Sequence, residues 1–128
     1  MRDFTNLTTW QRAHRLVLEI YKETRSFPPE ERYGLTNQVR RSAASVPANI
    51  AEGAGRRTDT DFARFVDYAL GSVNETQYHL LLARDLGLIT SETHERLVGE
   101  LREIRMMTGA LAQRLREQQH SKPTRADS

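Results

Sequence analysis

Four histidines and seventeen acidic residues are the side chains of this 128-residue chain that could bind a metal or carry acid–base chemistry. Helical proteins bind pairs of iron ions through glutamates and Glu-x-x-His motifs, whose two members project from the same side of a helix. The one Glu-x-x-His pair here is Glu117 with His120, close to the C-terminal end of the sequence. Glu75 and His79 are one helical turn apart, a spacing more typical of a hydrogen bond on a helix surface. We therefore predict no metal site and no cofactor.

Motifs for nucleophilic catalysis and phosphate transfer are equally weak. The chain has no cysteine, which excludes thiolate chemistry, iron–sulfur ligation and disulfides. Residues 53–57 combine two glycines with two arginines, but they lack the Lys-Ser/Thr ending of a phosphate-binding loop and fit the turn after a helix. No serine or threonine lies on a strand-to-helix turn beside a histidine. We predict that the protein is not an enzyme and has no catalytic residues.

The arginines say more about a possible partner than the histidines, serines and threonines do. The net charge is only +2, yet 17 of the 19 basic residues are arginine, which favours contacts with carboxylate and phosphate groups. Residues 36–57 carry four arginines against Glu52 alone, a local charge of +3, whereas residues 59–87 carry two arginines and five acids, a local charge of −3. Two interpretations follow for the four arginines: they bind RNA or another nucleic acid, or they pair with the acids across a subunit interface. The four are Arg40, Arg41, Arg56 and Arg57.

Four helical segments must position these side chains. Apolar residues recur at spacings of three and four over residues 7–26, 30–54, 58–87 and 91–117. Pro47 lies inside the second segment, where we expect a kink and not a stop. Because the connections are short, neighbouring helices must be antiparallel. The sequence thus predicts an all-α, antiparallel up-down-up-down four-helix bundle over residues 1–117, followed by a flexible polar tail over residues 118–128 that includes the bases Lys122 and Arg125.

A polar pair lies inside the second helix. Asn49 and Glu52 flank Ile50, so at least one of them should approach the core, where an unpartnered polar group costs about 1–3 kcal/mol. We expect a structural role for the pair, in which it locks the kink and the following loop; a buried ligand site is the alternative. The expected partners are the carbonyl of Ala43 freed by Pro47, the N-terminal backbone of the third helix, or one of Arg40, Arg41 and Arg57.

The third helix has an unusually wide apolar face. Leu80, Leu81 and Leu82 are consecutive and span about 200° of the helix circumference, more than one seam of a bundle buries. We predict that these leucines form part of an oligomer interface. No apolar run approaches the ~20 residues of a membrane span, and the N-terminal residues lack a signal-peptide pattern. We therefore expect a cytoplasmic protein without membrane contact.

Five stretches of the chain resemble a known family. They are Leu7 with Trp10; Ile20-Tyr21 with Phe27-Pro28 and Glu31; Gly34-Leu35 to Ala43; Ser45 to Gly53; and Ala69-x-Gly71-Ser72-x-x-Glu75 leading to Leu86-Gly87. With these residues the chain resembles, over residues 4–115, the bacterial four helix bundle protein family, whose members include open reading frames inside intervening sequences of large-subunit ribosomal RNA genes. The accessory variability determinant of diversity-generating retroelements is similar at a greater distance.

The resemblance carries expectations about assembly and partners. It implies a homopentamer of bundles arranged as a ring or short barrel, and for the retroelement relative it implies a basic surface that contacts RNA and a reverse transcriptase. It implies no established activity for the main family. We therefore expect a non-enzymatic, self-assembling scaffold with RNA as its partner. The alternative is a structural oligomer or adaptor that docks a protein such as a reverse transcriptase without direct nucleic-acid contact.

Overall fold

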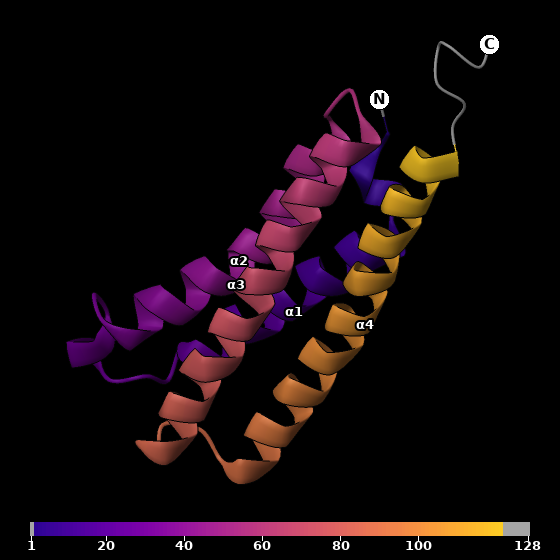
Figure 1. The fold of residues 1–128 in the computed structure, drawn as a ribbon. Helices are drawn as coiled ribbons and strands as arrows, with labels where there is room; N and C mark the ends of the chain where they lie inside the picture. Colours follow the sequence, from indigo (N-terminus) through magenta and orange to yellow (C-terminus); the bar gives the residue numbers. More distant parts are fainter. Residues whose placement is uncertain (1, 122–128) are drawn as a thin grey trace.

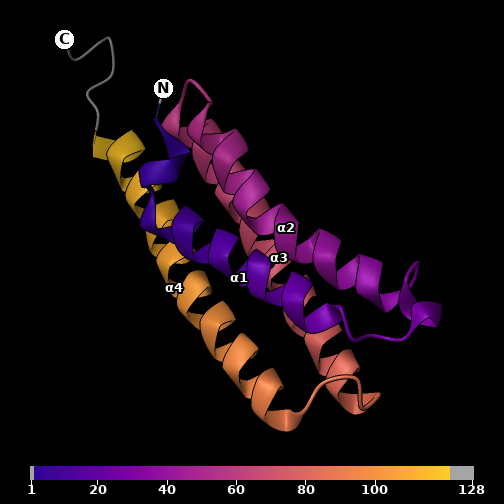
Figure 2. The ribbon, with the colours of Figure 1, turned by 180° about the vertical axis from the view of Figure 1, so that it is seen from behind.

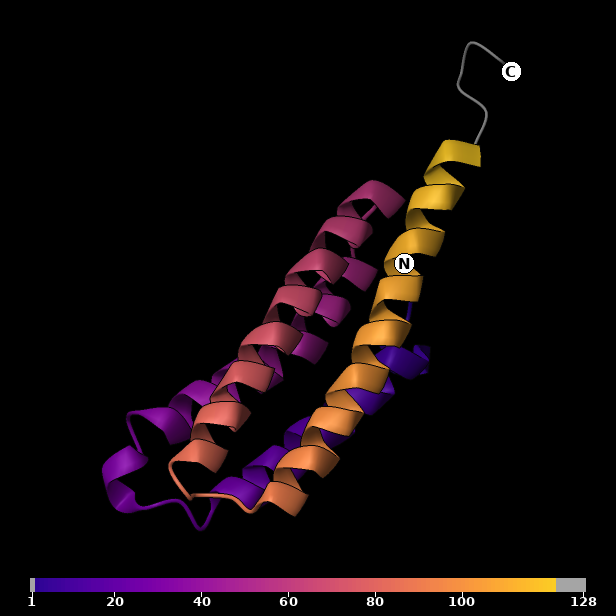
Figure 3. The ribbon, with the colours of Figure 1, turned by 60° about the horizontal axis from the view of Figure 1, so that its bottom comes forward.

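The computed structural model describes residues 2–121 and consists, over this range, of four α-helices and two short 3₁₀ turns. Each helix packs antiparallel to the next, and α3 and α4 lie in front of α1 and α2 in the view of Figure 3 (Figures 1 and 3). The all-α up-down-up-down bundle predicted from the sequence is confirmed. The elements are η1 (Phe4–Asn6), α1 (Thr8–Thr24), η2 (Pro29–Glu31), α2 (Leu35–Ala54), α3 (Asp59–Asp85) and α4 (Ser91–Ser121).

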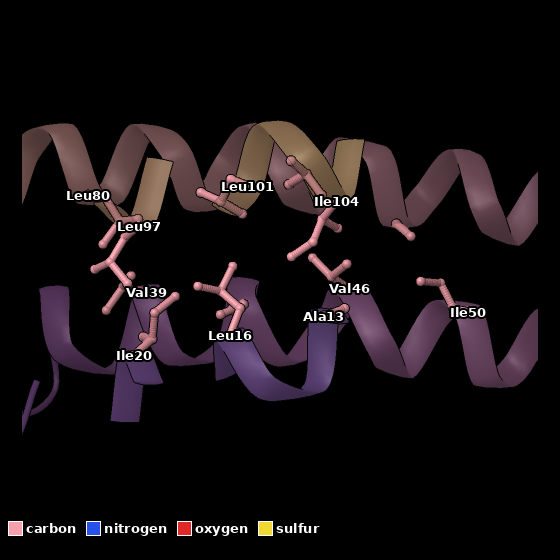
Figure 4. Packing of buried hydrophobic residues seen from close by; sticks show 13 residues of the cluster. Ala13, Leu16, Ile20, Val39, Val46, Ile50, Leu80, Leu97, Leu101 and Ile104 are labelled. Atoms are coloured by element: carbon pink, nitrogen blue, oxygen red, sulfur yellow. The ribbon is translucent and has the colours of Figure 1, made fainter. Parts of the chain in front are cut away.

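The core is a continuous cluster of aliphatic side chains contributed by all four helices. Figure 4 shows Ile20 of α1 and Val39 of α2 facing Leu80 of α3 and Leu97 of α4. Each fully buried Leu or Ile contributes about 1.5–3 kcal/mol, so this cluster fixes the relative positions of the helices. A second cluster around Phe62 packs α2, α3 and α4 together near the α2–α3 turn.

Side-chain caps begin the two C-terminal helices. The Thr58 hydroxyl accepts a hydrogen bond from the Asp61 amide at 3.1 Å, and the Thr90 hydroxyl accepts one from the Thr93 amide at 3.1 Å. Each bond satisfies a donor that the first turn of a helix leaves unpaired. At the other end of α3, Gly87 has a φ of +77°, a left-handed conformation that favours glycine and ends the helix.

Two predicted boundaries were wrong. The second helix begins at Leu35 and not near residue 30, because residues 29–31 form the separate turn η2 and Gly34 is non-helical, with φ −106° and ψ −115°. The fourth helix continues to Ser121, so residues 118–121 of the predicted tail are helical. Residues 113–119 are strong helix formers, which favours continuation of the helix past Leu115, the last buried residue among those with described side chains. The rest of the predicted tail, with Lys122 and Arg125, lies outside the described residues.

Pro47 and Gly53 shape the path of α2 against α3. The helix continues through Pro47, as predicted, and its direction changes along its length (Figure 2). Gly53 lies in the last turn of α2, where an added Cβ would come within 2.7 Å of Phe62 Cδ1 and 2.9 Å of Phe65 Cβ. Gly53 is therefore required by the close approach of α3 and not by a turn.

Candidate nucleic-acid interface

The four arginines predicted to bind nucleic acid do not form one surface, since two of them are used inside the subunit. Arg40 Nε donates to the Thr24 hydroxyl at 2.8 Å, and Arg40 Nη2 donates to the Tyr21 carbonyl at 3.3 Å. Its positive charge thus lies at the C-terminal end of α1, where the helix dipole is negative and carbonyls lack helical partners. Arg56 pairs with Glu52 at 3.0 Å, and its guanidinium lies 4.6 Å from the centre of the Phe65 ring.

The other two arginines are free in the subunit. Arg41 and Arg57 are both exposed, and neither forms a hydrogen bond or ion pair with the described residues. Arg41 lines an open groove between α2 and α3, opposite Glu75, whereas Arg57 lies in the turn between these helices. Of the four predicted contacts, only Arg41 and Arg57 are therefore placed to meet a partner.

A basic surface on α1 was missed by the sequence analysis. Arg15 and Lys22 of this helix and Arg25 at its end are exposed and form no ion pair among residues 2–121, although Arg15 lines a hollow together with Glu19 and Glu100. The two acids of α1 are used in ion pairs with α4: Glu19 and Glu23 both bind Arg96, at 3.1 and 2.9 Å. The outward side of α1 is therefore basic, although the helix sequence contains both signs. The spacing of the three bases, opposite the apolar stripe of α1, was the sequence signal that could have revealed it.

Rings and an apolar side chain lie between these bases. The exposed His14 ring stacks on Trp10, with centroids 5.0 Å apart and planes inclined by 8°. Tyr21 is 42% exposed and Leu18 is 57% exposed. Basic groups interleaved with ring faces are typical of surfaces that bind single-stranded nucleic acid, because bases stack on the rings while the cations contact phosphates. We call this surface the α1 face; it consists of His14, Arg15, Leu18, Tyr21, Lys22 and Arg25.

Asn49 and Glu52 have partners, but not the expected ones. Asn49 Nδ2 donates to the backbone carbonyl of Ser45 at 2.8 Å and to its hydroxyl at 2.9 Å. The Ser72 hydroxyl of α3 donates to the same Ser45 hydroxyl at 3.0 Å. Glu52 is exposed and pairs with Arg56. The predicted partners were wrong because the Asn49 side chain folds back along its own helix, and it is linked to α3 only through Ser45.

The three leucines proposed for an oligomer interface have different environments. Leu80 is 1% exposed and belongs to the central core, so it cannot contact another subunit. Leu82 is half-buried against the cluster around Phe27, whereas Leu81 is 37% exposed. The expected continuous apolar face is absent because α3 packs against both α2 and α4, which together cover more of its circumference than one seam would.

The expected hydrogen bond between Glu75 and His79 is present, with 3.1 Å between Oε2 and Nε2. Within residues 2–121, no three His, Asp or Glu side chains gather closely enough to hold a metal ion. None of the helices in this range combines the length and the apolar character needed to cross a membrane.

These features define an all-α bundle with an arginine-rich surface, and comparison with known proteins identifies its family. Residues 5–110 match the model of the 23S rRNA-intervening sequence protein family, and the chain belongs to this family. It is also similar to the crystal structure of a protein of unknown function from the S23 ribosomal protein family of Bacteroides thetaiotaomicron. The two chains are 25% identical with a TM-score of 0.74, over 82% of this chain and 98% of the other. No match was found among curated proteins.

Proposed function

We propose that this protein is a non-enzymatic, self-assembling scaffold that binds single-stranded RNA through the α1 face. The observation that supports the proposal is the charge of that face: three exposed bases without acidic partners, because both acids of α1 bind Arg96 of α4. Arg41 and Arg57 are secondary phosphate contacts. Arg40 and Arg56 have internal partners and serve the fold.

Assembly multiplies the affinity of a face that is weak on its own. Three bases give one subunit few phosphate contacts, but linking several copies makes each further contact intramolecular and raises the total affinity. The family resemblance implies five copies. Light scattering after gel filtration should therefore give a mass near five times 14.7 kDa. A monomer at every concentration would contradict the scaffold.

RNA binding is tested by fluorescence anisotropy with a labelled oligouridine at low salt. Reversing two charges of the α1 face, with Arg15→Glu and Lys22→Glu, should weaken binding by at least about tenfold, because attraction to phosphates becomes repulsion. Arg41→Glu with Arg57→Glu tests the secondary contacts and should have a smaller effect. The matched control is Arg32→Glu with Arg114→Glu, which reverses two exposed charges elsewhere. The proposal is wrong if the wild type does not bind, or if the α1 variant binds as the control does.

A protein-docking scaffold is the second candidate. Three of the four tyrosines lie exposed at or near α3: Tyr33, Tyr68 and Tyr78, with exposed fractions of 83%, 49% and 59%. Tyrosine is enriched in protein interfaces, where it offers a large contact area and a hydroxyl. An assembled protein without affinity for RNA would favour this candidate, an adaptor for a protein such as a reverse transcriptase. Loss of assembly in Tyr33→Ser or Tyr78→Ser would instead assign these tyrosines to the contact between subunits.

A further inference from the structure

A groove between α3 and α4 is lined by two arginines and two amide side chains, and by no carboxylate. Its cavity volume is about 460 Å³, within the range of sites for small organic ligands. We call it the α3–α4 groove; its lining includes Asn74, Gln77, Tyr78, Leu81, Arg102 and Arg105.

Arg105 is held in this groove without being neutralised. Its Nη2 donates to the side-chain oxygens of Asn74, at 3.1 Å, and of Gln77. Other arginines of α4 bind carboxylates instead: Arg96 pairs with Glu19 and Glu23, and Arg116 pairs with Asp67. Because amide oxygens orient a guanidinium but do not cancel its charge, Arg105 keeps a full positive charge in a fixed position.

The groove as a whole offers hydrogen-bond donors and no carboxylate. Asn74 and Gln77 use their oxygens on Arg105, so their NH₂ groups remain to donate. Arg102 lines the same groove and has no partner among the described residues. Burial, followed by the charge of Arg84, lowers the pKa of His94 at one side of the groove, against the opposing charges of Asp85 and Glu95. The lining thus contains two arginines and no carboxylate.

An apolar surface lies beside these donors. The exposed side chains of Leu81 and Tyr78 line the groove from α3, and the buried Val98 lies beside them on α4. A bare inorganic ion would use the arginines and leave this surface in contact with water. A ligand with a flat apolar body would cover it, gaining about 25 cal/mol for each Å² of apolar surface removed from water.

We propose that the α3–α4 groove binds a small organic oxyanion, namely a carboxylate or a phosphate carried by a planar apolar body. The oxyanion contacts Arg102 and Arg105, and the planar body lies against Tyr78 and Leu81. This site is separate from the α1 face, and it does not depend on RNA binding.

The experiment is an NMR titration of the ¹⁵N-labelled full-length protein with four probes: phenyl phosphate, benzoate, inorganic phosphate and benzyl alcohol. Phenyl phosphate, benzoate or both should cause saturable shifts of groove residues, and comparing the two distinguishes phosphate from carboxylate recognition. Inorganic phosphate lacks the body and benzyl alcohol lacks the charge, so each should bind at least about tenfold more weakly than the better aryl anion.

Variants assign the binding to the groove. Arg105→Gln should weaken the binding of the aryl anion by at least about tenfold, since hydrogen bonds to charged groups are among the stronger hydrogen bonds. Arg114→Gln is the matched control, because Arg114 is an exposed arginine on the same helix without an ionic partner in the described chain, and it should leave affinity unchanged. Leu81→Gln should weaken the binding of phenyl phosphate but not the binding of inorganic phosphate. Equal binding of all four probes, or equal effects of Arg105→Gln and Arg114→Gln, would overturn the proposal.

Discussion

The contact between α2 and α3 differs in chemistry from the contact between α1 and α4. Small polar side chains join α2 to α3: the Thr76 hydroxyl donates to Ser42 at 2.9 Å, and the Ser72 hydroxyl donates to Ser45 at 3.0 Å. Within residues 2–121 no ion pair joins these two helices, which make the most extensive contact in the bundle. In contrast, α1 and α4 make the least extensive contact of the adjacent helices, and long charged side chains span it.

This difference determines where unpaired charge remains on the surface. Ion pairs across the α1–α4 contact consume the acids of α1, so the bases on its outward side have no partner. Hydroxyls and glycine close the α2–α3 contact without using charged groups, so Arg41 stays unpaired at an open groove, opposite a Glu75 that binds His79 of its own helix. The chemistry that joins two helices therefore decides the charge of the surfaces beside them.

The close approach of α2 and α3 should respond most strongly to mutation. In Gly53→Val the added side chain would collide with Phe62 and Phe65, and overpacking of this kind costs about 3 kcal/mol. Gly71→Val is the matched control, because nothing lies within 4 Å of a Cβ at Gly71, and its stability should change by less than about 0.5 kcal/mol. Urea unfolding measures both. Equal losses in the two variants would show that α3 does not approach α2 at Gly53.

A buried hydroxyl pair should be the most sensitive point of the α1–α4 contact. Thr9 and Thr108 share a hydrogen bond of 2.6 Å and are both buried. Thr9→Val leaves the Thr108 hydroxyl without this partner and should cost about 1–2 kcal/mol. Adding Thr108→Val removes the stranded hydroxyl and should recover part of the loss. If the two single losses simply add in the double variant, the hydroxyls do not interact.

The polar link that runs from Asn49 to α3 should contribute less. Asn49→Ala removes two hydrogen bonds to Ser45, but Asn49 is only half-buried, and Ser45 keeps its bond from Ser72. We expect a loss of about 1 kcal/mol in the free energy of unfolding. A double-mutant cycle with Ser45→Ala checks the assignment, since the coupling energy should vanish if Asn49 acts through another residue.

The ion pair of Arg12 with Glu100 should give the smallest effect, and one that depends on pH. A hydrogen bond of 2.7 Å from Arg12 lowers the pKa of Glu100 below its ordinary value of 4.5. The pair therefore contributes its full stability above pH about 4.5, and loses it as pH falls through the lower folded-state pKa. Both side chains are partly exposed, so the contribution is below about 1 kcal/mol. As the pH is lowered below about 4.5, the unfolding temperature Tm of Glu100→Gln should consequently fall less steeply than that of the wild type.

Local signals predicted the helices, whereas distant contacts decided the candidate site. The start of α3 next to Thr58 and the passage of α2 through Pro47 depend on neighbouring residues, so the sequence indicated both. Arg40 and Arg41 are adjacent and looked equivalent, yet Arg40 binds Thr24, 16 residues away, whereas Arg41 is free. The α1 face was missed for the same reason: Glu19 and Glu23 find their partner more than 70 residues further along the chain.

The most direct test of the RNA-binding proposal is the salt dependence of oligouridine binding. Each phosphate contact on a single strand contributes about −0.7 to the slope of log K against log salt concentration. Changing Arg15, Lys22 and Arg25 together to Gln removes three bases from each subunit without reversing any charge. Our account predicts a slope shallower by about 2 for each subunit that contacts the RNA, with assembly unchanged. An unchanged slope in this variant would show that the α1 face does not contact the phosphates, and would contradict the account.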